Sequence, residues 1–188
     1  MNRLHMVQGS GIDSDLNDTG REQAKRFFRE FAGEGFQAIY TSGLKRTHQS
    51  VQKFIDLGLK WQVLPELNEI SWGEKEGRAI TPEDDQTYGD TIRHWKAGRT
   101  DVAFVGGETP DAVAIRLRAG LAKILAATGE ERVLVCMHGR AMRVLLCLLL
   151  RYPLSQMETF EHRNLCLYKI NYTGTLFALE LANYNLRG

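Results

Sequence analysis

Hydrophobic residues recur along this chain with a helical period in three long stretches. An apolar residue returns every three or four positions across 19–33, 44–58 and 109–125. Thr19 with Glu22 three residues later predicts a capping box at the start of the first helix. A fourth helix is predicted from Arg140 to about Arg151, because the apolar positions continue there and Pro153 ends them.

Short apolar runs lie between these helices and predict strands. They are FQAIYTS, WQVLPELNEI, which leads into a loop, and RVLVCM, which is expected to be a fully buried strand. NLCLYKI and TLFALELA, joined by a short Tyr-Thr-Gly turn, predict an antiparallel hairpin. The alternation predicts an α/β three-layer sandwich, with a mainly parallel central sheet, helices on both faces and an antiparallel edge.

Residues 71–108 break this pattern. Gly, Asp, Glu and Thr dominate there, and only TIRHWKAG resembles a helix, so we expect a long irregular insertion of the kind that often carries function. Order returns where Thr109 and Pro110 predict the N-cap and first residue of the third helix.

Length and composition narrow the class of protein. The 188 residues predict a single domain, and the net charge of +1 without a basic stripe argues against nucleic-acid binding. The longest apolar run, VLLCLLL, is far shorter than the roughly 20 residues of a membrane span. We therefore expect no membrane partner and a cytoplasmic location. Cys136, Cys147 and Cys166 are predicted to pack in the core as free thiols.

Three chemically distinct side chains follow three predicted strands. Arg46 comes after FQAIYTS, Glu69 after WQVLPEL, and His138 directly after RVLVCM. Ligands of open α/β sheets bind beyond the carboxyl ends of the strands, so these side chains are expected on one rim. Each residue alone is more often structural, but together they suit a phosphate ester, with a guanidinium fork, a proton-bearing imidazole and a carboxyl group.

Two other ways of handling phosphate fail on spacing. No Gly-x-x-x-x-Gly-Lys-Ser/Thr loop is present. A cysteine phosphatase places five residues between its cysteine and arginine, whereas Arg140 and Arg143 follow Cys136 at the wrong separations.

At these same residues the chain resembles the histidine phosphatase superfamily, in its phosphoglycerate mutase-like branch. YTSGLKRTHQS is similar to the family's Ser-x-Leu-x-Arg segment and LNEISWGEKEG to its Leu-x-Glu segment, while GGETPDAVAIR and VLVCMHGRAMRVLL match two later blocks. The resemblance implies that Arg46 clamps a phosphoryl group, His138 donates to its oxygens, and Glu69 protonates the leaving group. It also implies that Glu108 and Gly139 help to form the same rim.

One family element has no counterpart in the sequence. The family's first strand ends in Arg-His-Gly-x-Thr-x-x-Asn, and its histidine is the nucleophile. Here Asn2 matches the final asparagine and Gln8-Gly9 the following Gln-Gly, both as substrate-binding residues, and His5 is a poor substitute for the nucleophile. We expect an N-terminally truncated domain over 1–188 with its first strand absent: either the protein begins upstream of Met1, which we favour, or the short chain pairs with another, for example as a homodimer.

The main hypothesis is a phosphomonoester hydrolase that works through a phosphohistidine when complete, with this chain inactive. Its substrate would be a small phosphorylated metabolite or phosphate ion, and no metal or other cofactor is expected. The alternative is a catalytically inactive phosphate-binding or interaction module.

Overall fold

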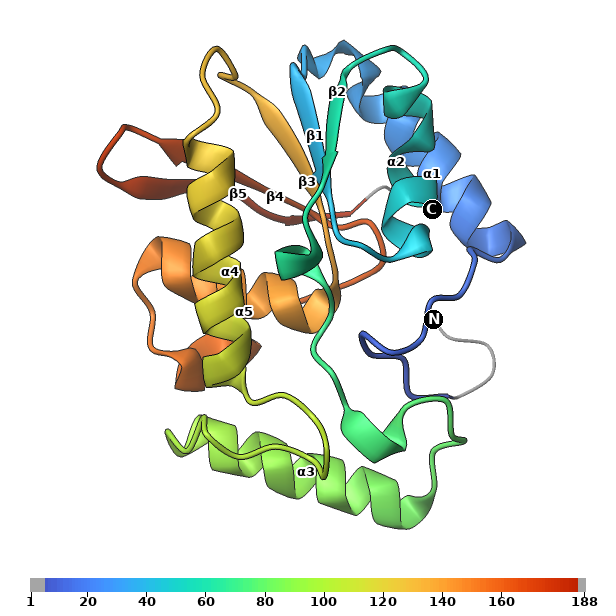
Figure 1. The fold of residues 1–188 in the computed structure, drawn as a ribbon, viewed down its shortest axis with the longest axis vertical. Helices are drawn as coiled ribbons and strands as arrows, with labels where there is room; N and C mark the ends of the chain where they lie inside the picture. The colour runs from blue at the N-terminus through green and yellow to red at the C-terminus, as the bar shows by residue number, and fades with distance from the viewer. Residues whose placement is uncertain (1–5, 186–188) are drawn as a thin grey trace.

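The computed structural model describes residues 6–185. Figure 1 shows the arrangement of its helices and strands. In chain order the main elements are α1 (Asp18–Phe31), β1 (Ala38–Thr41), α2 (Lys45–Ile55), β2 (Lys60–Val63), α3 (Pro82–Lys96), α4 (Pro110–Leu125), β3 (Val133–Cys136), α5 (Gly139–Leu150), β4 (Leu167–Tyr172) and β5 (Phe177–Tyr184). Short 3₁₀ turns join several of them, including Pro65–Leu67 after β2 and Leu154–Thr159 after α5.

The strands form two sheets within the described residues. The central sheet is parallel, in the order β2-β1-β3, and its register pairs Ala38 with both Lys60 and Val133. The predicted hairpin forms from β4 and β5, which pair antiparallel with each other as a two-stranded sheet of their own. The carboxyl ends of β1, β2 and β3 therefore point in one direction.

Helices cover the central sheet on both faces, so the predicted α/β fold class is confirmed. Strand side chains alternate between faces: Ile39 packs in a core cluster with residues of α1 and α2, whereas Tyr40 belongs to the cluster that includes α4 and α5. In Figure 1, α1 and α2 lie to one side of β1 and α4 to the other, and α3 lies apart at the bottom.

Two helix starts differ from the prediction. The capping box at Thr19 is wrong, because Asn17 is the N-cap of α1 and its side chain accepts a hydrogen bond from the Gly20 amide at 2.9 Å. The helix in the irregular insertion starts nine residues before TIRHWKAG, where Thr81 and Asp84 form a capping box around Pro82. The start of α4 at Thr109 and Pro110 is confirmed.

Burial of β3 is lower than predicted. Of its four residues only Leu134 is buried, while Val133, Val135 and Cys136 are partly exposed, so the prediction of a fully buried strand is wrong. The reason is topological: within residues 6–185, β3 pairs with β1 alone and so lies at the edge of its sheet.

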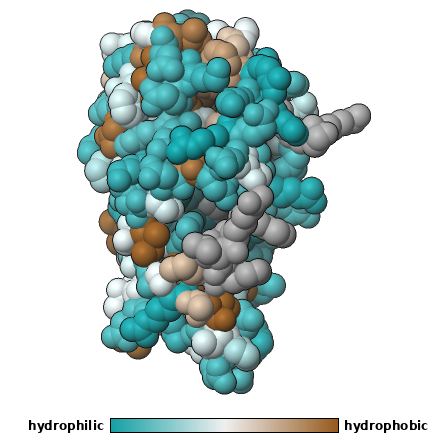
Figure 2. All heavy atoms as spheres, turned by 90° about the vertical axis from the view of Figure 1, so that its right-hand side faces the viewer, coloured by the Kyte–Doolittle hydropathy of each residue, from teal (hydrophilic) through white to brown (hydrophobic). Residues whose placement is uncertain are grey.

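The outer surface agrees with amphipathic helices. Figure 2 views the side that α1 and α2 cover, and this face is mainly hydrophilic with scattered hydrophobic residues. Across residues 6–185, no helix combines the length and apolar character needed to cross a bilayer.

Candidate active site

Arg46 and His138 meet at the carboxyl end of the central sheet. His138 follows β3 as the N-cap residue of α5, and Arg46 lies in the first turn of α2, which follows β1. The Arg46 Nε donates a hydrogen bond to His138 Nδ1 at 3.2 Å. The two side chains that sequence reasoning placed on one rim are thus in direct contact.

A loop near the start of the described chain fixes the rest of the Arg46 guanidinium. Its two terminal nitrogens donate to the carbonyl oxygens of Ile12, at 2.6 Å, and Gly9, at 3.2 Å. Gly9 therefore holds the arginine through its carbonyl, whereas the family resemblance implies a contact with substrate. A Cβ on Gly9 would lie 2.1 Å from Glu76 Oε1 and 2.7 Å from the Ile70 carbonyl oxygen, so only glycine fits this close approach.

Glu69 reaches the same place from the segment after β2. One carboxylate oxygen accepts hydrogen bonds from the backbone amides of Ala141, at 2.9 Å, and Ile70, at 3.0 Å. The other oxygen accepts from the backbone amide of Arg140 at 3.2 Å. The carboxylate thus occupies the positive N-terminus of α5, two and three residues after His138. Arg46, Glu69 and His138 lie around one helix terminus, although Glu69 accepts hydrogen bonds there and has no proton-donating contact.

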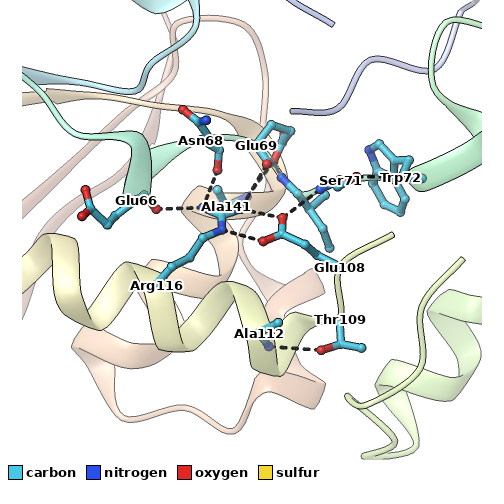
Figure 3. A network of polar contacts seen from close by, with 12 residues as sticks. Glu66, Asn68, Glu69, Ser71, Trp72, Glu108, Thr109, Ala112, Arg116 and Ala141 are labelled. Atoms are coloured by element: carbon cyan, nitrogen blue, oxygen red, sulfur yellow. Dashed lines mark hydrogen bonds and ion pairs between the residues drawn. The ribbon is translucent and has the colours of Figure 1, made fainter. Parts of the chain in front are cut away.

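Arg116 holds the segment that carries Glu69, and sequence reasoning missed it. Its guanidinium donates to the carbonyl oxygens of Glu66, Asn68 and Glu69 at 2.7 to 3.0 Å. It also pairs with both oxygens of Glu108 at 2.8 and 2.9 Å (Figure 3). Arg116 lies in the GGETPDAVAIR block of the sequence, on α4, but no role was assigned to it there.

Glu108 arranges this rim through protein contacts. Besides Arg116, its carboxylate accepts from the Ser71 amide at 2.9 Å. Burial alone would raise the Glu108 pKa, but the hydrogen bonds from Arg116 and Ser71 outweigh that effect and hold the pKa below its usual value. Its predicted contact with substrate stays a prediction.

Ser42, also missed, links His138 to β1. It is the first residue after the strand, fully buried, and its Oγ lies 2.8 Å from His138 Nε2. The sequence signal was present in the Ser-x-Leu-x-Arg segment, where only the arginine received a role. A polar residue directly after an apolar strand marks the same sheet end as His138.

Two predicted substrate-binding residues, Gln8 and Gly139, contact other parts of the protein in the structure. Gln8 is exposed, and its side-chain amide donates to Ser14 Oγ at 3.4 Å. Asn2 lies outside the described residues. Gly139 is the first residue of α5, and a Cβ there would lie 2.8 Å from His162 Nδ1, so the His162 ring covers this glycine.

The electrostatics of the pair favour a neutral imidazole beside a charged guanidinium. Burial lowers the pKa of His138 to about 3, and the charges of Arg46, Arg116 and His162 act in the same direction. Burial also lowers the Arg46 pKa, opposed by the nearby carboxylates of Glu69, Asp13 and Glu76, but a guanidinium stays protonated in proteins. The site therefore offers a fixed positive charge at neutral pH, suited to an anion.

Comparison with known proteins identifies the family of the chain. The model of the histidine phosphatase superfamily (branch 1) matches residues 1–185, and the chain belongs to this family. Membership of this family supports a function of the phosphatase or mutase type.

Curated relatives carry both kinds of name. The chain is 31% identical over 175 residues to a probable phosphoglycerate mutase GpmB of Yersinia enterocolitica, covering 91% of this chain and 79% of that one. It is 30% identical over 151 residues to phosphoserine phosphatase 1 of Hydrogenobacter thermophilus, covering 79% and 71%.

Solved structures show the same fold. A mycobacterial glucosyl-3-phosphoglycerate phosphatase in complex with VO3 superposes with a TM-score of 0.86 at 24% identity, over 98% of this chain and 93% of that one. An α-ribazole phosphatase from Shigella flexneri gives 0.82 at 20% identity, over 97% and 92%.

Proposed function

We propose that this chain belongs to a phosphomonoester hydrolase that works through a phosphohistidine when complete. The contact between Arg46 Nε and His138 Nδ1 at the sheet end carries the proposal. A guanidinium held by two backbone carbonyls is preorganised to stabilise charge on a transferring phosphoryl group. His138 is the donor to the phosphoryl oxygens, and Glu69 is the acid for the leaving group.

Hydrolysis is the reaction that we propose, and the mutase reaction is its alternative. A relative named phosphoserine phosphatase 1, 30% identical over 79% of this chain, supports hydrolysis, while a relative named probable phosphoglycerate mutase GpmB, 31% identical over 91% of this chain, supports the alternative. The substrate is a small phosphorylated metabolite, bound in the cytoplasm, with no role for nucleic acid or a membrane. Phosphate and VO3 in structures of a related phosphatase support binding of a tetrahedral anion or its analogue.

We further propose that the 188-residue chain binds phosphate without turning over esters. The sequence contains no Arg-His-Gly-x-Thr-x-x-Asn segment to supply the nucleophile. His138 has both ring nitrogens engaged by Arg46 and Ser42. Pairing of two chains as a homodimer is a further proposal, tested by the molar mass in solution.

Isothermal titration with inorganic phosphate tests the binding site. The unmodified chain is expected to bind phosphate, and Arg46→Ala to weaken binding by about a hundredfold, the effect of losing one preorganised charged donor. Arg118→Ala is the matched control, because Arg118 is exposed on α4. Equal affinity of Arg46→Ala and the unmodified chain would remove Arg46 from the site.

Turnover of para-nitrophenyl phosphate tests the hydrolase. The 188-residue chain is expected to stay at background, and a version extended ahead of Met1 by a strand ending in the missing segment is expected to hydrolyse the ester with a burst of product. A burst of product from the 188-residue chain itself would contradict the first expectation. An extended version that folds and binds phosphate but does not hydrolyse the ester would contradict the proposed hydrolase activity.

A further inference from the structure

His138 is held at both ring nitrogens by a closed set of hydrogen bonds. Arg46 Nε contacts Nδ1 at 3.2 Å, and Ser42 Oγ contacts Nε2 at 2.8 Å. Ser42 Oγ also accepts from the Leu44 amide at 3.1 Å and lies 3.0 Å from Thr47 Oγ1. Ser42, Thr47 and His138 are all buried, so protein atoms alone must satisfy these groups.

The direction of each hydrogen bond follows from its partners. A guanidinium can only donate, so His138 Nδ1 must be the unprotonated nitrogen. A neutral imidazole then carries its one proton on Nε2 and donates it to Ser42 Oγ. Thr47 Oγ1 donates to the Leu44 carbonyl at 2.8 Å, which leaves it free to accept the Ser42 hydroxyl proton. Every donor and acceptor is satisfied in one arrangement.

We propose that Ser42 is a positioning residue for phosphoryl binding: it fixes the tautomer and ring orientation of His138, so that Nδ1 faces Arg46 and the anion. The inference rests on the proposed function. Ser42 itself is fully buried and contacts His138 Nε2, so it acts through the imidazole. Turning the ring over would replace Nε2 by a carbon at Ser42 and leave a buried hydroxyl pair without the imidazole donor.

Ser42 also suits the ring in its ligand-bound state. When dihydrogen phosphate takes the place of Arg46 at Nδ1, it can transfer one proton to that nitrogen and stay bound as the monohydrogen anion, and the imidazole then donates from both nitrogens. Ser42 Oγ accepts at Nε2 in either state without moving, since its own proton stays directed at Thr47. The low pKa of the buried, unliganded ring agrees with a single proton before the anion arrives.

Nitrogen-15 NMR of the imidazole and titration with inorganic phosphate test this role in the intact chain. Loss of the His138 signals in His138→Asn assigns them. The unmodified chain is expected to show one protonated Nε2 and one unprotonated Nδ1. Ser42→Ala is expected to give averaged signals from a tautomer mixture, together with phosphate affinity about tenfold weaker, the scale of one buried hydrogen bond.

Ser50→Ala is the control. It removes a serine hydroxyl on α2 that donates to the backbone carbonyl of Arg46 and is not bonded to the imidazole. It is expected to match the unmodified chain in both measurements. If Ser42→Ala fails to fold, Ser42→Cys keeps nearly the same volume with a weak acceptor and is expected to shift both readouts in the same direction.

The outcomes separate two failures. Ser42→Ala with an unchanged Nε2 tautomer and phosphate affinity within about twofold overturns the inference alone. An unmodified chain that binds no phosphate overturns the proposed function, and the tautomer measurement then still decides whether Ser42 orients the ring.

Discussion

Replacing Arg116 by alanine is expected to destabilise the chain by about 3 kcal/mol. The side chain makes two hydrogen bonds to the Glu108 carboxylate and one each to the carbonyls of Glu66, Asn68 and Glu69. Removing one member of a buried ion pair costs roughly 3 to 5 kcal/mol, and the lower figure applies because the two side chains are 19% and 28% exposed.

Urea unfolding followed by tryptophan fluorescence measures this loss. For a chain of this size, about 3 kcal/mol corresponds to a fall in Tm of roughly 6 to 12 °C. Arg116→Lys is expected to recover only a small part, because an ammonium cannot bridge a carboxylate and three carbonyls. Arg118→Ala, at an exposed position on the same helix, is expected to stay within about 0.5 kcal/mol.

A double-mutant cycle with Glu108→Ala separates the ion pair from the backbone contacts. The coupling energy between Arg116 and Glu108 is expected to be about 1 to 2 kcal/mol. The rest of the about 3 kcal/mol loss then comes from the hydrogen bonds of Arg116 to the three carbonyls. If Arg116→Ala unfolds at the same urea concentration as Arg118→Ala, the guanidinium does not hold the Glu69 segment and the reasoning fails.

Three further expectations concern stability. Burial lowers the His138 pKa to about 3, so as the pH falls below about 6.5 this histidine takes up a proton in the unfolded chain but not in the folded one. The free energy of unfolding should therefore fall by about 2 kcal/mol between pH 7 and pH 5. Urea unfolding of His138→Asn at several pH values should show a smaller dependence on pH. Gly9→Ala should cost about 1 to 3 kcal/mol through its clash with the Ile70 carbonyl, whereas Gly33→Ala, with open space around it, should be neutral or better in thermal melts; equal melts would contradict the clash. Glu69→Gln should cost about 1 to 2 kcal/mol in urea unfolding, since its amide faces a backbone donor of α5, and unchanged unfolding would argue against that contact.

The order of helices and strands could be predicted from the sequence because each element carries its own periodicity. The irregular insertion could not, since α3 has few buried residues: Thr91 and Trp95 are its buried positions, too few to give a clear helical stripe. Thr81 and Pro82 nevertheless repeat the signal that correctly located the start of α4 at Thr109 and Pro110.

The site could be predicted as far as strand ends allow. Arg46, Glu69 and His138 each follow a strand, so the geometry of a parallel sheet brings them to one rim. Ser42 and Arg116 act on the other site residues through hydrogen bonds that depend on tertiary contacts 96 residues apart for Ser42 and His138 and 47 for Arg116 and Glu69. Such distant partners leave no periodic trace in a single sequence.

The edge position of β3 has a consequence for handling the protein at high concentration. Three residues of its apolar Val-Leu-Val-Cys run are partly exposed, and within residues 6–185 the strand pairs on one side only, so the main-chain donors and acceptors of its other side have no strand partner there. Any extended peptide that meets this strip can add to it as a further strand. An unpaired edge strand of this kind should cause self-association that increases with protein concentration. Val135→Lys should suppress that self-association.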